Sequence, residues 1–154
     1  MSDISEQLLA SVGNLAGSFA VLEFEIVDCL SLIVNDADLE IGMIVCDRLS
    51  FSQTLTLIGD FTRRKLGDSC CSDFRTLSRD LQAAARLRND ILHSSWAFPL
   101  DGEQREVFQE RARRRNSGPD VHDAEELLAR LAEGRKQMWE LYDRVITFKK
   151  NYLC

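Results

Sequence analysis

The sequence predicts an all-α fold: an up-and-down bundle of four to five helices with a short extended or β-hairpin insertion before the last helix. Only two prolines and eight glycines interrupt 154 residues, so long stretches lack the residues that end helices. Within those stretches, apolar residues recur at intervals of three and four, which places them on one helical face. We therefore expect a single helical domain over residues 1–154, with 96–118 as the insertion.

The first half of the chain contains three predicted helices. The first extends from about residue 3 to 34, and a shorter one follows at about 37–49. The third begins at 50–52, where serine is a common capping residue, and ends at 67–69, where glycine is typical of a helix end. Gly13 and Gly17 lie four residues apart on the first helix and indicate a close helix crossing. The apolar stripe of the first helix consists of Leu8, Leu9, Val12, Leu15, Phe19, Leu22, Ile26, Leu30 and Ile33.

The helix expected at about 71–95 carries an apolar seam in which one position is arginine. Such a stripe faces inward, so Arg88 stands where a leucine is expected. Burying a guanidinium is costly unless anions or acceptors meet it. We expect Glu23, Glu25 or a bound phosphate to do so; the alternative is a packed stem whose charged end reaches water. The seam consists of Phe74, Leu77, Leu81, Ala84, Arg88 and Ile91.

The last third begins with an extended segment and ends with a long helix. Two arms within 96–108 are expected to flank a turn, because Asp-Gly at 101–102 favours a hairpin. Asp120 or Asp123 is expected to cap the last helix, which continues to about residue 152. We interpret His122 as part of this capping context. The apolar stripe of the last helix consists of Leu127, Leu128, Leu131, Met138, Leu141, Val145 and Phe148.

The charge balance limits the kinds of partner. A net charge of −6 argues against a protein that coats nucleic acid, because affinity for phosphate comes from Lys and Arg. A small basic cleft within an acidic body is still allowed. Fifteen of the 19 basic residues are arginines, clustered at 63–65, 86–88 and 111–115. Arginine makes forked hydrogen bonds to phosphate or carboxylate; the alternative is that each cluster is a solvated face.

Targeting signals, membrane spans and metal motifs are not evident in the sequence. The chain has no basic start followed by an apolar block and no run of about 18 apolar residues, so we expect a cytoplasmic protein without a membrane partner. Five cysteines are an odd number for a disulfide framework. We expect no disulfide, no zinc and no cofactor. Cys70-Cys71 is interpreted as small residues near a helix start, with a vicinal redox pair as the alternative.

The seam arginine belongs to a group of polar residues that suit chemistry on phosphate. On an ideal helix, Asn89 and His93 are about 40° apart around the axis, so the Asn amide can orient the imidazole. Arg88 lies about 140° from His93. The Arg side chain must therefore reach around the helix, or a second helix must close over the site. That second helix can be the same helix of another subunit.

The six residues from Arg88 to His93 resemble the Arg-x4–6-His motif of the HEPN superfamily, in the form where Asn follows Arg. The similarity of pattern covers about residues 3–95 and the closing helix. The resemblance implies a homodimer whose paired motifs face a cleft, with Arg88, Asn89 and His93 as catalytic residues. Where HEPN toxins silenced by nucleotidyl transfer have a Tyr two residues after the His, this chain has Ser95, so that form of control is not carried over.

Many HEPN proteins are ribonucleases of toxin–antitoxin, phage-defence or RNA-processing systems, and some are non-catalytic. The resemblance therefore implies RNA as substrate and an antitoxin or defence protein as a further partner. The residue types suit metal-independent cleavage of single-stranded RNA by 2′-hydroxyl attack, since histidine transfers protons near neutrality and arginine holds phosphoryl oxygens. Two alternatives are a non-catalytic HEPN-like dimer that binds a nucleotide, RNA or protein, and a helical interaction protein of unrelated lineage.

Overall fold

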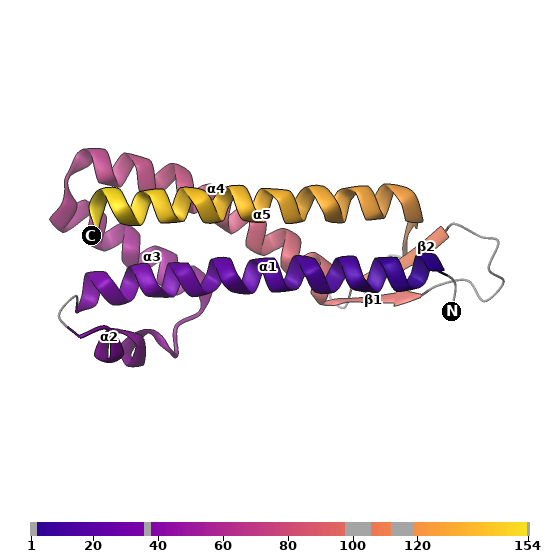
Figure 1. Ribbon diagram of the computed structural model, residues 1–154, viewed down its shortest axis with the longest axis horizontal. Coiled ribbons are helices and arrows are strands. Elements are labelled where there is room, and N and C mark those ends of the chain that lie inside the picture. The colour runs from indigo at the N-terminus through magenta and orange to yellow at the C-terminus, as the bar shows by residue number, and fades with distance from the viewer. Residues whose placement is uncertain (1–2, 36–37, 98–105, 112–118, 154) are drawn as a thin grey trace. The chain divides into compact units, whose positions relative to one another are not determined.

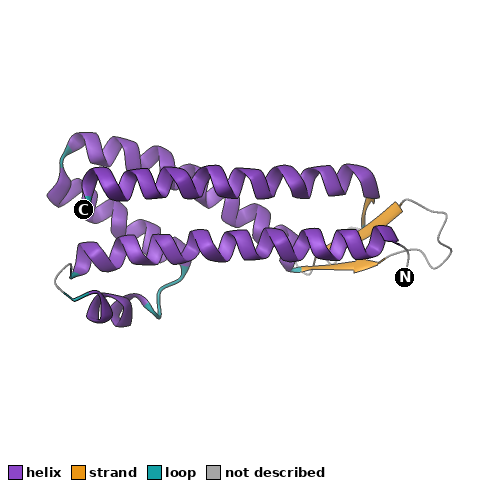
Figure 2. Ribbon diagram, viewed as in Figure 1, coloured by secondary structure: helices purple, strands orange, loops and turns teal. Residues whose placement is uncertain are grey.

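The computed structural model describes residues 3–35, 38–97, 106–111 and 119–153, and in them the chain is mainly helical (Figures 1 and 2). The prediction of an all-α bundle with an extended insertion before the last helix is confirmed. The elements in chain order are α1 (Asp3–Val34), α2 (Leu39–Cys46), α3 (Phe51–Phe61), the π-helical turn η1 (Thr62–Leu66), α4 (Asp68–Leu92), β1 (Ser94–Ala97), β2 (Glu106–Arg111), β3 (Asp120–Asp123) and α5 (Ala124–Tyr152).

The chain divides into two compact units, and three helices contribute to both. Unit 1 takes the described residues of 1–19 and 84–137, which include the three strands and the C-terminal end of α4. Unit 2 takes those of 20–83 and 138–154, which include α2, α3 and η1. Most members of the predicted stripes are buried, while Leu9 is 52% exposed.

Unit 1 combines helical segments with a small sheet. A Cβ atom added to Gly134 of α5 would lie 3.0 Å from Leu87 Cδ2 and 3.3 Å from Leu15 Cδ1, so α1, α4 and α5 meet here. The sheet has the order β1-β2-β3 with both pairs antiparallel. The third strand was not predicted. Asp123 is the last residue of this strand and also caps α5, because its Oδ1 accepts hydrogen bonds from the backbone N–H groups of Glu125 and Glu126, at 2.9 and 3.1 Å.

Unit 2 shows the local signals that its sequence predicts. Ser50 and Gln53 form a reciprocal capping box at the start of α3. Gly67 has a φ of 87°, which other residues rarely adopt, and it separates η1 from α4. Two hydrogen bonds join α4 and α5: Arg144 donates to Asp80, and Tyr152 donates to Asp73. The later residue of α5 thus contacts the earlier residue of α4, so the two helices run antiparallel.

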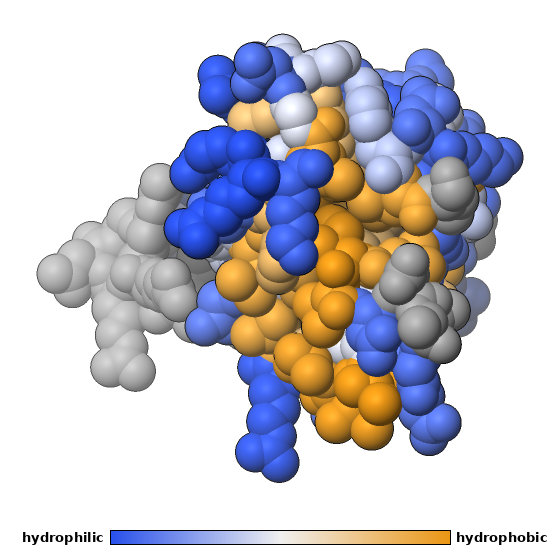
Figure 3. Space-filling model, turned by 90° about the vertical axis from the view of Figure 1, so that its left-hand side faces the viewer, coloured by the Kyte–Doolittle hydropathy of each residue, from blue (hydrophilic) through white to orange (hydrophobic). Residues whose placement is uncertain are grey.

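The helix α2 lies close to α1 and turns apolar side chains outward. A Cβ atom on Gly42 would lie 2.7 Å from the backbone oxygen of Ser31, so only glycine allows this approach. Three other residues of α2, Ile41, Ile44 and Val45, are 50%, 68% and 54% exposed. Figure 3 shows the apolar surface on the side of the molecule where α2 lies.

Several predicted boundaries and contacts differ from the structure. The helix expected at 37–49 is shorter, at Leu39–Cys46, and the helix expected at 71–95 occupies Asp68–Leu92 instead. The close crossing predicted at Gly13 and Gly17 is wrong for the described residues, since a Cβ atom on either glycine would have no neighbour within 4 Å. The turn predicted at 101–102 lies outside the described residues.

Candidate functional site

The predicted seam of α4 is the inward face of that helix, and it positions Arg88. Phe74, Leu77, Leu81 and Ile91 are each at most 4% exposed, and Ala84 is 7% exposed. Arg88 lies between Ala84 and Ile91 on this face and is half-buried. The apolar spacing alone therefore placed this arginine correctly, on a face that otherwise holds only apolar residues.

Arg88 is held by an aromatic ring and by its neighbour in sequence. Its guanidinium carbon lies 5.4 Å from the centre of the Phe19 ring, a cation–π contact. Its Nη1 donates a hydrogen bond to Asn89 Oδ1 at 2.9 Å. Its Nε is buried and has no hydrogen-bond partner. The guanidinium thus keeps donor capacity that the described part of the chain does not use.

No ion pair of Arg88 occurs among the described residues. Glu25 accepts a hydrogen bond from Lys149 at 3.4 Å within unit 2. Glu23 and Glu25 belong to unit 2 and Arg88 belongs to unit 1, so the expected Glu partner stays a prediction. A half-buried guanidinium without a counter-ion in the described chain is the kind of group that an incoming anion would stabilise.

His93 lies one residue beyond α4, in a turn. Its backbone N–H still donates to Asn89 O at 3.0 Å, so the backbone keeps a helical bond at this point. The His93 side chain is exposed. The predicted contact between the Asn89 amide and the imidazole is not present in the described structure, because the amide oxygen accepts from Arg88 instead. The structure therefore brings Arg88 and Asn89 together and leaves the His93 ring separate.

The sheet closes the C-terminal end of α4 through side chains. The last carbonyl groups of a helix have no partner within it. Gln109 Nε2 donates to Asp90 O at 3.0 Å, and Trp96 Nε1 donates to Ile91 O at 3.1 Å. Gln109 Nε2 also donates to Ser94 Oγ at 2.7 Å. Two carbonyls at the end of the motif helix are thus fixed by residues of the insertion.

His122 belongs to the same hydrogen-bonded network, which the sequence did not predict. Its Nε2 lies 2.9 Å from Gln109 Oε1, and its ring centre lies 6.3 Å from that of Trp96. Because the Gln109 amide nitrogen donates to two acceptors, its oxygen must accept, so His122 Nε2 carries the proton. Gln109 is only 1% exposed. The predicted cap of α5 is confirmed at Asp123. His122, next to it, is a strand residue, which the sequence did not predict.

A signal for this network was present in the sequence but weak. Val107 and Gln109 alternate on the buried face of β2, and their partners in the register are His122 and Asp120. Period-two alternation over so few residues, with mostly polar members, does not distinguish a strand from a loop. Trp96 is half-buried, and its indole N–H donates to Ile91 O.

No disulfide joins the cysteines of the described chain, which are at positions 29, 46, 70 and 71. Cys70 is fully buried near the start of α4. Burial, with smaller effects of Asp73 and Cys71, raises the pKa of its thiol above the ordinary value. A raised pKa disfavours the reactive thiolate, which supports packing over redox chemistry for Cys70-Cys71. Cys154 lies outside the described residues.

Comparison with protein-family models, with curated proteins and with solved structures gave no match. Within the described ranges, no three His, Cys, Asp or Glu side chains gather as a metal site would require. None of the described helices has the length and apolar character that a membrane crossing needs.

Proposed function

We propose that this chain is a metal-independent endoribonuclease of HEPN type that cleaves single-stranded RNA by attack of the 2′-hydroxyl. One observation carries the proposal: the guanidinium of Arg88 is half-buried on an apolar seam, has no carboxylate partner in the described chain, and keeps a buried Nε without an acceptor. Such a group is stabilised when phosphoryl oxygens reach it. Asn89 restrains the guanidinium through Nη1.

The chemistry requires two proton transfers and stabilisation of charge on phosphorus. A base removes the 2′-hydroxyl proton, the 2′-oxygen bonds to phosphorus, and the bond to the 5′-oxygen breaks as an acid protonates that oxygen. The products are a 2′,3′-cyclic phosphate and a free 5′-hydroxyl. Arg88 would stabilise the phosphorane, and the exposed ring of His93 would transfer one proton.

The second proton transfer is the reason to propose a homodimer. One chain contributes one motif histidine, whereas the reaction uses an acid and a base at the same time. A two-fold dimer with facing motifs would supply both. We expect sedimentation velocity to give a dimer at micromolar concentration. A monomer under the conditions in which the protein cleaves RNA would contradict the two-motif site.

A non-catalytic function is the second candidate, and one observation favours it. No side-chain hydrogen bond to the His93 ring occurs within the described residues, so nothing in them orients the imidazole for proton transfer. Arg88 and Asn89 would then hold an anionic group of a nucleotide, an RNA or a protein partner. An antitoxin or a phage-defence protein is one such partner that the motif resemblance suggests.

Cleavage of single-stranded RNA in EDTA distinguishes the two candidates. We expect the wild-type protein to yield 2′,3′-cyclic phosphate ends, and His93→Ala to lose about 10²- to 10⁴-fold in rate. Arg88→Met should lose about 10²- to 10³-fold, yet its free energy of unfolding should not fall, because the variant removes a buried donor without a partner. Arg130→Met, on the exposed surface of α5, is the matched control and should cleave normally.

The substrate provides an independent control. An RNA with a 2′-deoxy residue at the scissile position should resist cleavage at that bond, since it lacks the nucleophile. Cleavage of this substrate at the same bond, or full activity of His93→Ala, would show that the mechanism is wrong. Absence of cleavage together with tight, Arg88-dependent RNA binding would favour the non-catalytic function.

A further inference from the structure

A second basic site lies in unit 2, in a groove between α3 and the first half of α4. The groove has a volume of about 330 Å³. Its wall includes three arginines, Arg63, Arg75 and Arg79, and a single carboxylate, Asp60. The groove is therefore basic, although the whole chain carries a net charge of −6. The site shares no residue with the motif around Arg88.

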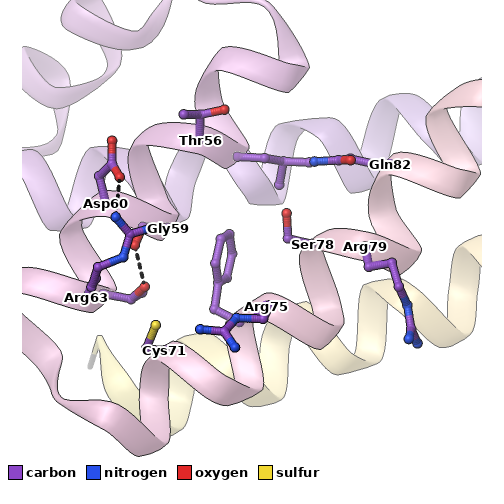
Figure 4. Close-up of a pocket in the computed structure, with 12 residues that line it drawn as sticks. Thr56, Gly59, Asp60, Arg63, Cys71, Arg75, Ser78, Arg79 and Gln82 are labelled. Atoms are coloured by element: carbon purple, nitrogen blue, oxygen red, sulfur yellow. Dashed lines mark hydrogen bonds and ion pairs between the residues drawn. The ribbon is translucent and has the colours of Figure 1, made fainter.

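The local backbone explains why these arginines lie along one groove. Arg63 lies in the π-helical turn η1 at the end of α3, and π-turns are frequent at functional sites. Arg75 and Arg79 lie four residues apart on α4, and so occupy the same side of that helix. Figure 4 shows Arg63 and Arg75 on the two sides of the groove, with Arg79 at its edge.

The arginines keep donors that protein carboxylates do not use. Arg63 Nη1 is 3.4 Å from Asp60 Oδ1, and its side chain is 69% exposed. Arg79 bonds Asp80 only through Nε, at 3.0 Å. Asp80 is already shared with Arg144, and the hydrogen bond from Arg79, together with that from Arg144, holds the pKa of its carboxyl below the ordinary value.

Arg75 is the clearest candidate for binding a ligand. It is exposed, and no ion pair or hydrogen bond of its guanidinium occurs in the described part of the chain. Neutral polar groups complete the wall, with Thr56 on α3 opposite Ser78 and Gln82 on α4 (Figure 4). Hydroxyl and amide groups of this kind accompany arginine in contacts to phosphate and sugar oxygens.

We infer that this groove binds phosphate groups of a single-stranded RNA backbone. Arginine forks match the geometry of phosphoryl oxygens, and exposed side chains suit a flexible strand that passes over the surface. A free nucleotide offers the same phosphate chemistry, so the test must separate the two sources. The inference shares its ligand class with the proposed ribonuclease function, but it requires no cleavage.

Fluorescence anisotropy with a labelled, fully 2′-O-methylated 12-mer tests this site without cleavage of the probe. The groove variant is Arg75→Gln with Arg79→Gln. The control is Arg130→Gln with Arg135→Gln, which makes the same change in net charge on exposed residues of α5. We expect the groove variant to bind at least about tenfold more weakly than the control.

The salt dependence gives a second and more specific readout. For single strands the slope of log K against log salt changes by about 0.7 for each phosphate contact. The slope of the groove variant should therefore fall by about 1.4, while the control keeps the wild-type slope. For Arg75→Gln alone the slope should fall by about 0.7. Because the Arg75 guanidinium has no partner in the described chain, this single variant serves as a control for loss of structure in the double variant.

Two outcomes would overturn the inference. Equal affinity and equal salt slope in the groove and control variants would show that the arginines are only a solvated face. Displacement of the probe by adenosine monophosphate at lower concentration than by unlabelled 12-mer would assign the groove to a nucleotide instead of a strand. If the wild-type protein cleaves RNA but the groove variant binds the probe as well as the control does, the groove inference fails and the proposed nuclease function stands. If binding depends on the groove arginines but the wild-type protein cleaves no RNA, the nuclease function fails and the groove inference stands.

Discussion

Replacing Gln109 with leucine should remove the hydrogen bonds that hold the end of α4 while a side chain of similar size stays buried at the same position. The side chain is 1% exposed and makes three hydrogen bonds, to Asp90 O, Ser94 Oγ and His122 Nε2. Each such bond contributes about 1 kcal/mol net, so the three together give about 3 kcal/mol. Asp90 O keeps its bond from Ser94 Oγ, and the buried leucine returns part of the loss. We expect Gln109→Leu to lower the free energy of unfolding by about 2 kcal/mol.

Urea unfolding followed by circular dichroism measures this change, and Gln137→Leu is the matched control. Gln137 is exposed and, among the described residues, its side chain bonds only Glu133, at 3.3 Å, so its replacement should change stability by less than about 0.5 kcal/mol. Amide hydrogen exchange gives a local readout: the His93 amide, bonded to Asn89 O, should exchange faster in Gln109→Leu. Wild-type stability and wild-type exchange in that variant would refute the reasoning.

Two further predictions concern unit 2 and the glycines. Burial disfavours the charged form of Lys149, but its hydrogen bond and charge attraction to Asp28, with those to Glu25, are stronger and raise the pKa of its ammonium group. Lys149→Met should lower the free energy of unfolding by about 2 kcal/mol at pH 7. This difference from the wild type should shrink as the pH rises above about 10.4, the ordinary lysine pKa, and through the raised pKa of the folded protein. A constant difference in urea unfolding up to pH 11.5 would contradict the prediction. Gly42→Ala should destabilise the protein by about 1–3 kcal/mol in thermal unfolding, because its Cβ would meet Ser31 O. Gly17→Ala, with open space around it, should stabilise the protein by about 0.5–1 kcal/mol. The opposite order of the two variants would show that the helix contacts are misassigned.

Local signals in the sequence predicted the helices of this chain well. The capping serine at position 50 and the glycine at 67 act within a few residues of their own position, so the chain itself carries their effect. The seam of α4 was predictable for a related reason: spacing of three and four fixes which side chains share a face. The same spacing predicts the position of Arg88 on that face.

The elements that the sequence failed to predict depend on contacts distant along the chain. β3 has only Val121 as an apolar residue, and it is a strand because it pairs with β2. The helix α4 ends at Leu92 and not at the predicted residue 95, because Ser94 begins the strand that pairs with β2. Gln109 and His122 meet only once that pairing exists.

Hydrogen-bond satisfaction separates the polar groups of unit 1 into two kinds with opposite expected effects. Gln109 uses its amide oxygen and both amide hydrogens, so its removal leaves partners without bonds and costs stability. Arg88 keeps a buried Nε without an acceptor, so its removal relieves a cost to folding. The proposed function accounts for this cost through a phosphate ligand that would use the unpaired Nε. Comparing the stability and RNA cleavage of Arg88→Met with those of Gln109→Leu therefore tests whether unused donors in this chain mark its functional site.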